Sequence, residues 1–137
     1  MMTTKIHPEA TLPTRAHPDD AGLDLYALEE VIIAPREGKM ARSGIAVALP
    51  AHTVGLICDR SSMAKKGIKT AGGVIDAGYR GEIQVVFWNL SQQEVRIARG
   101  DRMAQMLILT IQTPAVREVK DLNPTSRGAG GFGSTGA

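Results

Sequence analysis

The sequence has one cysteine, few aromatic residues and no long apolar run. Cys58 alone cannot form an intrachain disulfide or a multi-cysteine zinc site. No stretch approaches the roughly 20 apolar residues that a membrane-spanning helix needs. The N-terminal residues MMTTKIHPEA lack the apolar core of a secretion signal. We therefore expect a soluble, cytoplasmic protein without a disulfide framework.

The chain also has no strong excess of charge of either sign. It carries 16 Lys and Arg against 14 Asp and Glu, a formal net charge of +2. So small an excess argues against stable binding to nucleic acid or to an anionic membrane. The 137 residues, 43% of them hydrophobic, fit one ordinary globular domain.

Glycine and proline, with 15 and 7 residues, divide the chain into short segments. Several segments alternate apolar and polar residues with the period of a strand. We expect strands at 31–34, 45–49, 54–58, 83–87, 95–97 and 106–111. The last of these is continuously apolar, which predicts a strand buried on both faces. Many short strands between Gly and Pro turns indicate an all-β sandwich or barrel.

Two segments have helical character. The sequence SSMAKK at 61–66 places a serine at a candidate N-cap and Gly67 at a candidate C-cap. Residues 115–122 are compatible with a helix or with an extended chain. The glycine-rich residues 125–137 have the composition of a flexible tail.

A candidate anion site lies in DRSSMAKKG, residues 59–67. Arg60 offers a planar bidentate donor, and Ser61 and Ser62 offer hydroxyls beside the free N–H groups of a helix start. Phosphate is the natural ligand of that combination. The alternative is a capped helix beside a surface arginine.

Three more segments carry polar residues in apolar surroundings. GGVIDAGYRGEIQV, residues 72–85, predicts a β-hairpin with Asp76 at its mouth and Tyr79 near its tip; a plain turn is the alternative. Asp24 in AGLDLYA is either the polar member of a half-buried strand or a functional carboxylate near a cation. In GDRMAQM, Arg102 and Gln105 are possible phosphate contacts, or parts of a polar turn.

These segments, in this order and with the tail RGAGGFGSTG, resemble the five motifs of the trimeric dUTP diphosphatases (dUTPases) from Ala21 to Gly136. The resemblance implies a jelly-roll β-sandwich that hydrolyses dUTP to dUMP and diphosphate with Mg²⁺. Such an enzyme limits uracil in DNA and supplies dUMP for dTMP synthesis. The resemblance also implies a homotrimer with active sites at subunit interfaces. It divides the chain into a β domain, 1–124, and a C-terminal lid, 125–137.

The resemblance further implies a role for individual residues. Asp76 would orient and activate the water that attacks the α-phosphorus, and Tyr79 would pack against the deoxyribose and exclude a 2′-hydroxyl. Asp24 would act near Mg²⁺, through waters or by fixing a partner side chain. The substrate-binding residues would be Arg60, Ser61, Ser62 and Gln105 for phosphates, Gly73, Val74, Ile75 and Gln84 for uracil, and Arg127, Phe132, Gly133, Ser134 and Thr135 in the lid.

Two other functions remain open on the sequence. A dCTP deaminase, alone or combined with the diphosphatase, has the same fold and needs a glutamate as proton shuttle. The matching position here is Val86, which cannot transfer a proton. A non-catalytic nucleotide-binding protein would be expected to have lost Asp76 or the glycine-rich tail, and this chain has both.

Overall fold

Alternating apolar and polar residues fold most of the chain into short antiparallel strands. The computed structural model describes residues 1–131, which contain eleven strands and one short helix. The elements are β1 (Met2–Lys5), β2 (Leu23–Tyr26), β3 (Val31–Ile33), β4 (Gly38–Arg42), β5 (Ile45–Ala48), β6 (Thr53–Cys58), α1 (Ser61–Lys65), β7 (Ile68–Ala71), β8 (Val74–Asp76), β9 (Gln84–Asn89), β10 (Val95–Ile97) and β11 (Arg102–Thr110). The predicted all-β class is confirmed.

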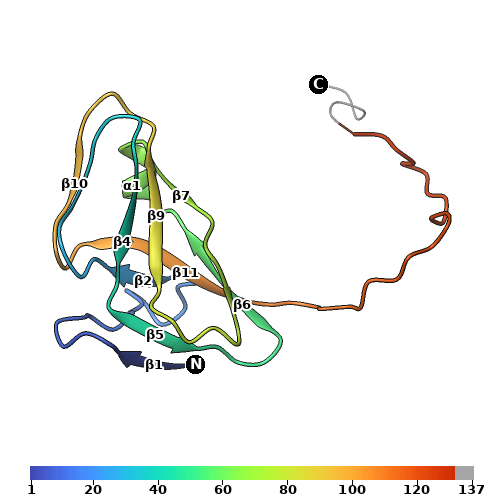
Figure 1. Ribbon diagram of the computed structural model, residues 1–137, viewed down its shortest axis with the longest axis horizontal. Helices are drawn as coiled ribbons and strands as arrows, with labels where there is room; N and C mark the ends of the chain where they lie inside the picture. Colours follow the sequence, from blue (N-terminus) through green and yellow to red (C-terminus); the bar gives the residue numbers. More distant parts are fainter. Residues whose placement is uncertain (132–137) are drawn as a thin grey trace.

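Two sheets form the body of the molecule (Figure 1). One has the strand order β2-β11-β6-β8 and the other β4-β9-β7, with β1-β5 and β3-β10 as additional pairs. Leu25 and Met106 of the first sheet share one buried cluster with Val85 and Phe87 of the second. The two sheets therefore pack face to face as a β-sandwich.

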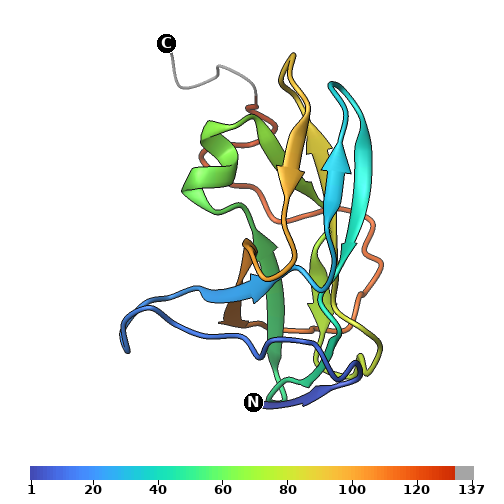
Figure 2. The same ribbon diagram turned by 90° about the vertical axis from the view of Figure 1, so that its left-hand side faces the viewer.

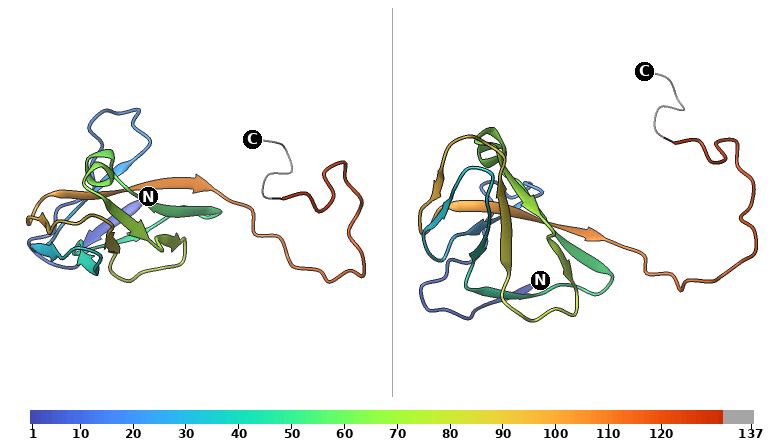
Figure 3. Two further views of the ribbon diagram at one scale, coloured as in Figure 1. Left: turned by 90° about the horizontal axis from the view of Figure 1, so that it is seen from above. Right: turned by 45° about the horizontal axis from the view of Figure 1, so that its top comes forward.

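β11 is longer than predicted and is buried over a different part. Its buried residues are Met103, Ala104 and Met106, whereas Leu109 is 44% exposed. The cause is its pairing: β2 pairs only with Arg102–Met106, and β6 pairs with β11 from Gln105 to Thr110. The outer half of β11 thus runs along β6 beyond the end of β2 (Figure 3). The expectation that residues 106–111 are buried on both faces is wrong.

The predicted helix is present, but no serine caps it. Arg60 is the N-cap residue, with extended backbone angles, and its carbonyl oxygen accepts the N–H groups of Met63 and Ala64 at 2.9 Å each. Ser61 is therefore the first helical residue, and its hydroxyl is free for other partners. Gly67 follows the helix with φ +79°, as a C-terminal glycine should.

The predicted hairpin at 72–85 is wrong. β8 pairs with β6 in one sheet, and β9 pairs with β4 and β7 in the other. Gly72 and Gly73, with φ +70° and +93°, redirect the chain from β7 into the opposite sheet. Asp76 and Gln84 consequently lie at the ends of strands from different sheets, joined by the loop 77–83.

The chain after β11 leaves the body. Residues 111–131 contain no helix or strand, so the helical alternative for 115–122 is wrong and the extended one holds. Figure 1 shows this segment running clear of the two sheets before it turns back, and in Figure 2 it lies behind the body. Val116 is fully exposed. Within residues 1–131, no helix has the length and apolar character to cross a membrane.

Candidate active site

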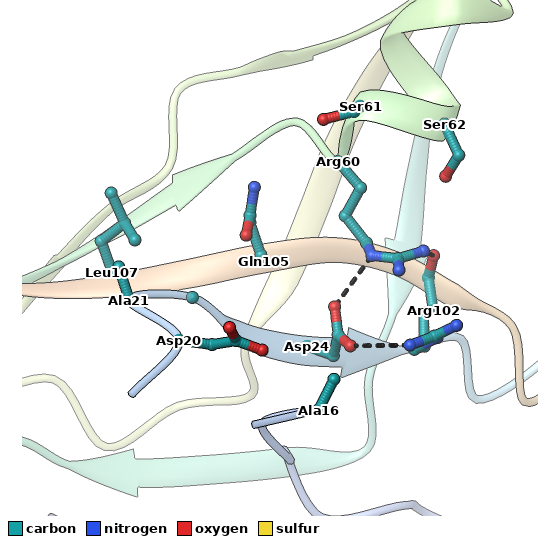
Figure 4. Close-up of a pocket in the computed structure, with 11 residues that line it drawn as sticks. Ala16, Asp20, Ala21, Asp24, Arg60, Ser61, Ser62, Arg102, Gln105 and Leu107 are labelled. Carbon is teal, nitrogen blue, oxygen red and sulfur yellow. Dashed lines mark hydrogen bonds and ion pairs between the residues drawn. The ribbon is translucent and has the colours of Figure 1, made fainter. Parts of the chain in front are cut away.

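Five of the predicted site residues surround one cavity of about 600 Å³ (Figure 4). They are Asp24 from β2, Arg60, Ser61 and Ser62 from the start of α1, and Gln105 from β11. Asp24, Gln105 and Cys58 lie opposite one another on three adjacent strands, and the chain reaches Arg60 two residues after Cys58. The sheet register therefore brings together three motifs that are far apart in the sequence. We call this set, together with Arg102, the phosphate half-site.

A carboxylate between two guanidinium groups organises the phosphate half-site. Asp24 Oδ1 lies 2.8 Å from Arg60 Nε, and its Oδ2 lies 3.3 Å from Arg102 Nη1. Arg60 Nη1 also donates to the carbonyl oxygen of Arg102 at 3.0 Å. Since the Asp24 side chain is only 13% exposed, these contacts hold the Arg60 side chain in one orientation. Both arginines keep unused N–H donors for an anionic ligand.

Gln105 occupies the floor of the same cavity. Its Nε2 donates to the carbonyl oxygen of Asp59 at 2.8 Å, which ties β11 to the residue before Arg60. A Cβ at position 22 would lie 2.1 Å from the Gln105 amide oxygen, so a larger residue there would displace this amide from its present position. Gly22 in AGLDLYA therefore leaves space for the side chain of Gln105 in GDRMAQM.

Sequence reasoning missed the role of Asp59. Its Oδ1 accepts hydrogen bonds from the N–H and the hydroxyl of Thr70, at 2.6 and 2.8 Å, and its Oδ2 pairs with Lys69 Nζ at 2.5 Å. Burial raises the pKa of Asp59, but the hydrogen bonds from Lys69 and Thr70 outweigh it and the pKa lies below its usual value. The carboxylate thus anchors the turn before Arg60 to β7. The position of an acidic residue directly before Arg60-Ser61-Ser62 is the sequence feature that could have indicated this role.

Another five predicted residues surround a second cavity of about 280 Å³. We call it the nucleoside half-site; its predicted members are Val74, Ile75, Asp76, Tyr79 and Gln84. Met40, Glu82 and Val86 complete the lining. The cavity lies between the edge of one sheet and the outer face of the other, because β8 and β9 belong to different sheets.

Glu82 fixes the loop that carries Tyr79. Its carboxylate accepts the N–H of Gly44 at 2.8 Å and Arg42 Nε at 3.0 Å, and its carbonyl oxygen accepts the Tyr79 hydroxyl at 3.1 Å. Burial raises the pKa of Glu82, but the hydrogen bonds from Gly44, Arg42 and Gln84 outweigh it, so the pKa lies below its usual value. Sequence reasoning missed this residue, although the acidic group in YRGE was visible.

The two half-sites are far apart within one chain. β2 and β8 are opposite edges of the four-stranded sheet, about 14 Å apart at roughly 4.8 Å per strand. Along the strands, Asp24 aligns with Cys58 and Asp76 with Val54, a further offset of about 13 Å at roughly 3.3 Å per residue. Asp76 therefore lies on the order of 20 Å from Asp24, the residue that holds Arg60.

The remaining predicted residues do not line either cavity. The carbonyl oxygen of Gly73 accepts the N–H of Ile57 at 2.8 Å, so that oxygen is already used. Arg127 lies in the segment that leaves the body, and its Nε donates to Gly130 at 3.0 Å. Phe132, Gly133, Ser134 and Thr135 lie outside the described residues.

No protein-only metal centre is present among residues 1–131, since no three His, Cys, Asp or Glu side chains form a group there. Asp24 is already paired with two arginines, which leaves it poorly suited to direct coordination. Mg²⁺ keeps several waters and binds mainly through substrate phosphates, with one or two carboxylates nearby. One carboxylate and a set of phosphate-binding donors fit that indirect mode.

Known proteins match both the sequence and the fold. The family profile described as dUTPase matches residues 8–136. A deoxyuridine 5′-triphosphate nucleotidohydrolase of Nocardia farcinica is 47% identical and covers 96% of this chain and 82% of its own. The enzyme of the same name from Clostridium kluyveri is 46% identical, with 99% and 97% covered.

Solved structures of dUTPases have the same fold as this chain. The G164S mutant of a Staphylococcus bacteriophage 80alpha dUTPase with dUpNHpp superposes with a TM-score of 0.93 at 28% identity, covering 99% of this chain and 98% of that one. A phage phi11 dUTPase of S. aureus, described with a structural Mg(II) ion, gives 0.83 at 26% identity, covering 90% and 98%. These likenesses confirm the jelly-roll β fold. With its motifs, its fold and its relatives in agreement, this chain belongs to the dUTPase family.

Proposed function

We propose that this enzyme, which hydrolyses dUTP to dUMP and diphosphate, forms each active site from half-sites of different subunits of a homotrimer. The observation that carries the proposal is the separation of Asp76 from the Asp24–Arg60 pair, on the order of 20 Å. A general base acts within about 3 Å of its water, and that water must reach a phosphate that Arg60 holds. One chain cannot supply both groups to one substrate.

In the phosphate half-site, Arg60, Ser61, Ser62 and Gln105 bind the phosphate oxygens. Arg60 and Arg102 supply fixed positive charge where the leaving diphosphate develops its negative charge. Asp24 keeps Arg60 oriented before substrate arrives, so little reorganisation is needed during the reaction. When bound, Mg²⁺ would neutralise charge on the phosphates, with Asp24 accepting a hydrogen bond from one of its waters.

In the nucleoside half-site, Asp76 orients the attacking water and accepts its proton as the bond to the α-phosphorus forms. Tyr79 packs against the deoxyribose and excludes a 2′-hydroxyl. Its ring cannot move aside, because its hydroxyl donates a hydrogen bond to the backbone carbonyl of Glu82. We assign uracil binding to the backbone of 73–75, where Val74 and Ile75 line the cavity and the Gly73 carbonyl oxygen is already taken by Ile57, and to the region of Gln84.

The C-terminal segment acts as a lid in this proposal. Residues 125–137, with Arg127, Phe132, Gly133, Ser134 and Thr135, close over the phosphates and the base and exclude competing water. The support is the departure of the chain from the body after β11, which leaves the segment available to a neighbouring subunit. We also place the enzyme in the cytoplasm, where the free Cys58 would remain reduced.

Deamination has no support from the site. Val86, at the position of the deaminase glutamate, is 38% exposed on the wall of the nucleoside half-site and cannot carry a proton. A substrate panel tests the function: dUTP, dCTP, dTTP and UTP, with and without Mg²⁺, assayed for both diphosphate and ammonia. We expect diphosphate from dUTP and no ammonia from dCTP. Ammonia release, or turnover of dTTP equal to that of dUTP, would contradict the proposal.

A further inference from the structure

A small basic cavity adjoins the phosphate half-site, and the roles given above do not use it. It has a volume of about 240 Å³, and its charged lining is Arg60, Lys66, Arg96, Asp101 and Arg102. Arg60, Ser62 and Arg102 line both cavities. Figure 4 shows Ser61 and Ser62 pointing to different sides of the first helical turn, with Ser62 on the side of Arg102. The two cavities are therefore neighbours that share donors.

The side chains that line this cavity carry a net positive charge, although Asp24, which lies outside the lining, pairs with two of them, Arg60 and Arg102. Four cationic side chains line it against the single carboxylate of Asp101, whose Oδ2 already accepts the N–H of Ala98 at 2.9 Å. Arg96 pairs with Glu30, which lies outside the lining. Lys66 lines this cavity, and its ammonium group has no ion-pair partner among residues 1–131. An anion would neutralise this set of charges.

The volume of this cavity is sufficient for a small oxyanion. At about 30 Å³ per water, the cavity holds roughly eight water molecules. That is enough for a small phosphate oxyanion. Because Arg60 and Ser62 face both cavities, an anion held by them can be shared with Lys66 and Arg96 without first entering bulk water.

We propose that this cavity is a subsite for inorganic diphosphate, which it receives from the phosphate half-site after hydrolysis. The proposal rests on the phosphate role of Arg60 and Ser62 given above. Transfer of the product to Lys66 and Arg96 clears the phosphate half-site for the next dUTP. It also makes diphosphate an inhibitor whose affinity depends on two side chains outside the catalytic set.

Titration of the full-length enzyme with inorganic diphosphate, followed by calorimetry and by inhibition of dUTP hydrolysis, tests the subsite. Lys66→Gln and Arg96→Gln should each weaken diphosphate binding by about tenfold, the loss of one charge-assisted contact. Their kcat/KM for dUTP should stay within about twofold of wild type, since exposed charges outside the site contribute little. Orthophosphate should bind more weakly than diphosphate, because a single phosphate group cannot contact Arg60 and Ser62 at the same time as Lys66 and Arg96.

Lys65→Gln is the matched control, because Lys65 is the neighbouring lysine on α1 and does not line the cavity. It should leave diphosphate affinity unchanged. Wild-type affinity in both Lys66→Gln and Arg96→Gln would overturn the subsite, as would an equal loss in Lys65→Gln, which would show a general field effect. Normal dUTP turnover with unchanged diphosphate affinity would refute the subsite alone. Failure of the proposed function would appear separately, as turnover that Arg60→Ala does not reduce.

Discussion

Replacing Glu82 by glutamine should destabilise the enzyme and loosen its choice of sugar. The variant keeps the shape of the side chain but loses its charge, and its amide NH₂ must face at least one of three donors, the N–H of Gly44, Arg42 Nε or Gln84 Nε2. A hydrogen bond to a charged group contributes about 1.5–3 kcal/mol. Arg42 is 42% exposed, so its share is screened to about 1 kcal/mol or less. We expect a loss of about 2 kcal/mol at pH 7.

The pH dependence gives this prediction a sign. The pKa of Glu82 lies below its ordinary value of 4.5, so its stabilisation is fully present above that pH and is lost as the pH falls through the lowered value. The difference in unfolding free energy between wild type and Glu82→Gln should therefore be largest near neutral pH and shrink below about pH 4.5.

Urea unfolding at fixed protein concentration, at pH 7 and in acid, measures that difference. Glu94→Gln is the control, since Glu94 is exposed and has no ion pair within residues 1–131. The ratio of kcat/KM for dUTP over UTP should also fall. The Glu82 carboxylate holds the loop whose residue-82 backbone carbonyl accepts the Tyr79 hydroxyl, so loosening that loop should loosen Tyr79 as well. Equal stability of Glu82→Gln and wild type at pH 7, or a difference that persists unchanged in acid, would refute the reasoning.

Four further changes test the assigned roles. Asp76→Asn should lower kcat by roughly 10²–10⁴-fold with dUTP binding retained; near-normal turnover would remove Asp76 from its role. Tyr79→Ala should reduce the dUTP/UTP ratio of kcat/KM, and an unchanged ratio would place the discrimination elsewhere. Asp24→Asn should raise KM for dUTP by about tenfold, since Arg60 loses its 2.8 Å partner; an unchanged KM would show that Arg60 needs no such support. Truncation after Ser126 removes no strand of the described fold, so melting temperature and oligomer size should hold while turnover falls severely; full activity of the truncated enzyme would contradict the lid.

The strands could be predicted because their periodicity is a local property. The alternation survives in 83–87, where Val85 and Phe87 are buried and Val86 is exposed. In 54–58 the buried residues are Gly55 and Ile57, rather than the alternating Val54, Leu56 and Cys58, and in 45–48 three successive residues are buried. Pairing is not local. The turn chemistry of 72–85 resembles that of a hairpin, yet the positive φ of Gly72 and Gly73 sends β8 to the other sheet.

The site residues themselves came from the resemblance, and their arrangement came from the structure. Motif order cannot show that Asp24 and Asp76 lie on opposite edges of one sheet, because that depends on the order β2-β11-β6-β8. Asp59 and Glu82 were missed because each acts on a neighbour rather than on substrate. Their hydrogen-bond partners, Thr70 and Gly44, are distant in sequence and become adjacent only through sheet packing.

The most direct test of the shared active site mixes two inactive enzymes. Asp76→Asn lacks the base and Arg60→Ala lacks the phosphate contact, so each pure variant should be nearly inactive. After unfolding and joint refolding in equal amounts, about a quarter of the sites in randomly mixed trimers would pair an intact Asp76 with an intact Arg60 from another subunit. We predict recovery of about a quarter of the wild-type rate. If the mixture stays as inactive as its components while co-refolded wild type regains full activity, both residues act within one chain and the account is contradicted.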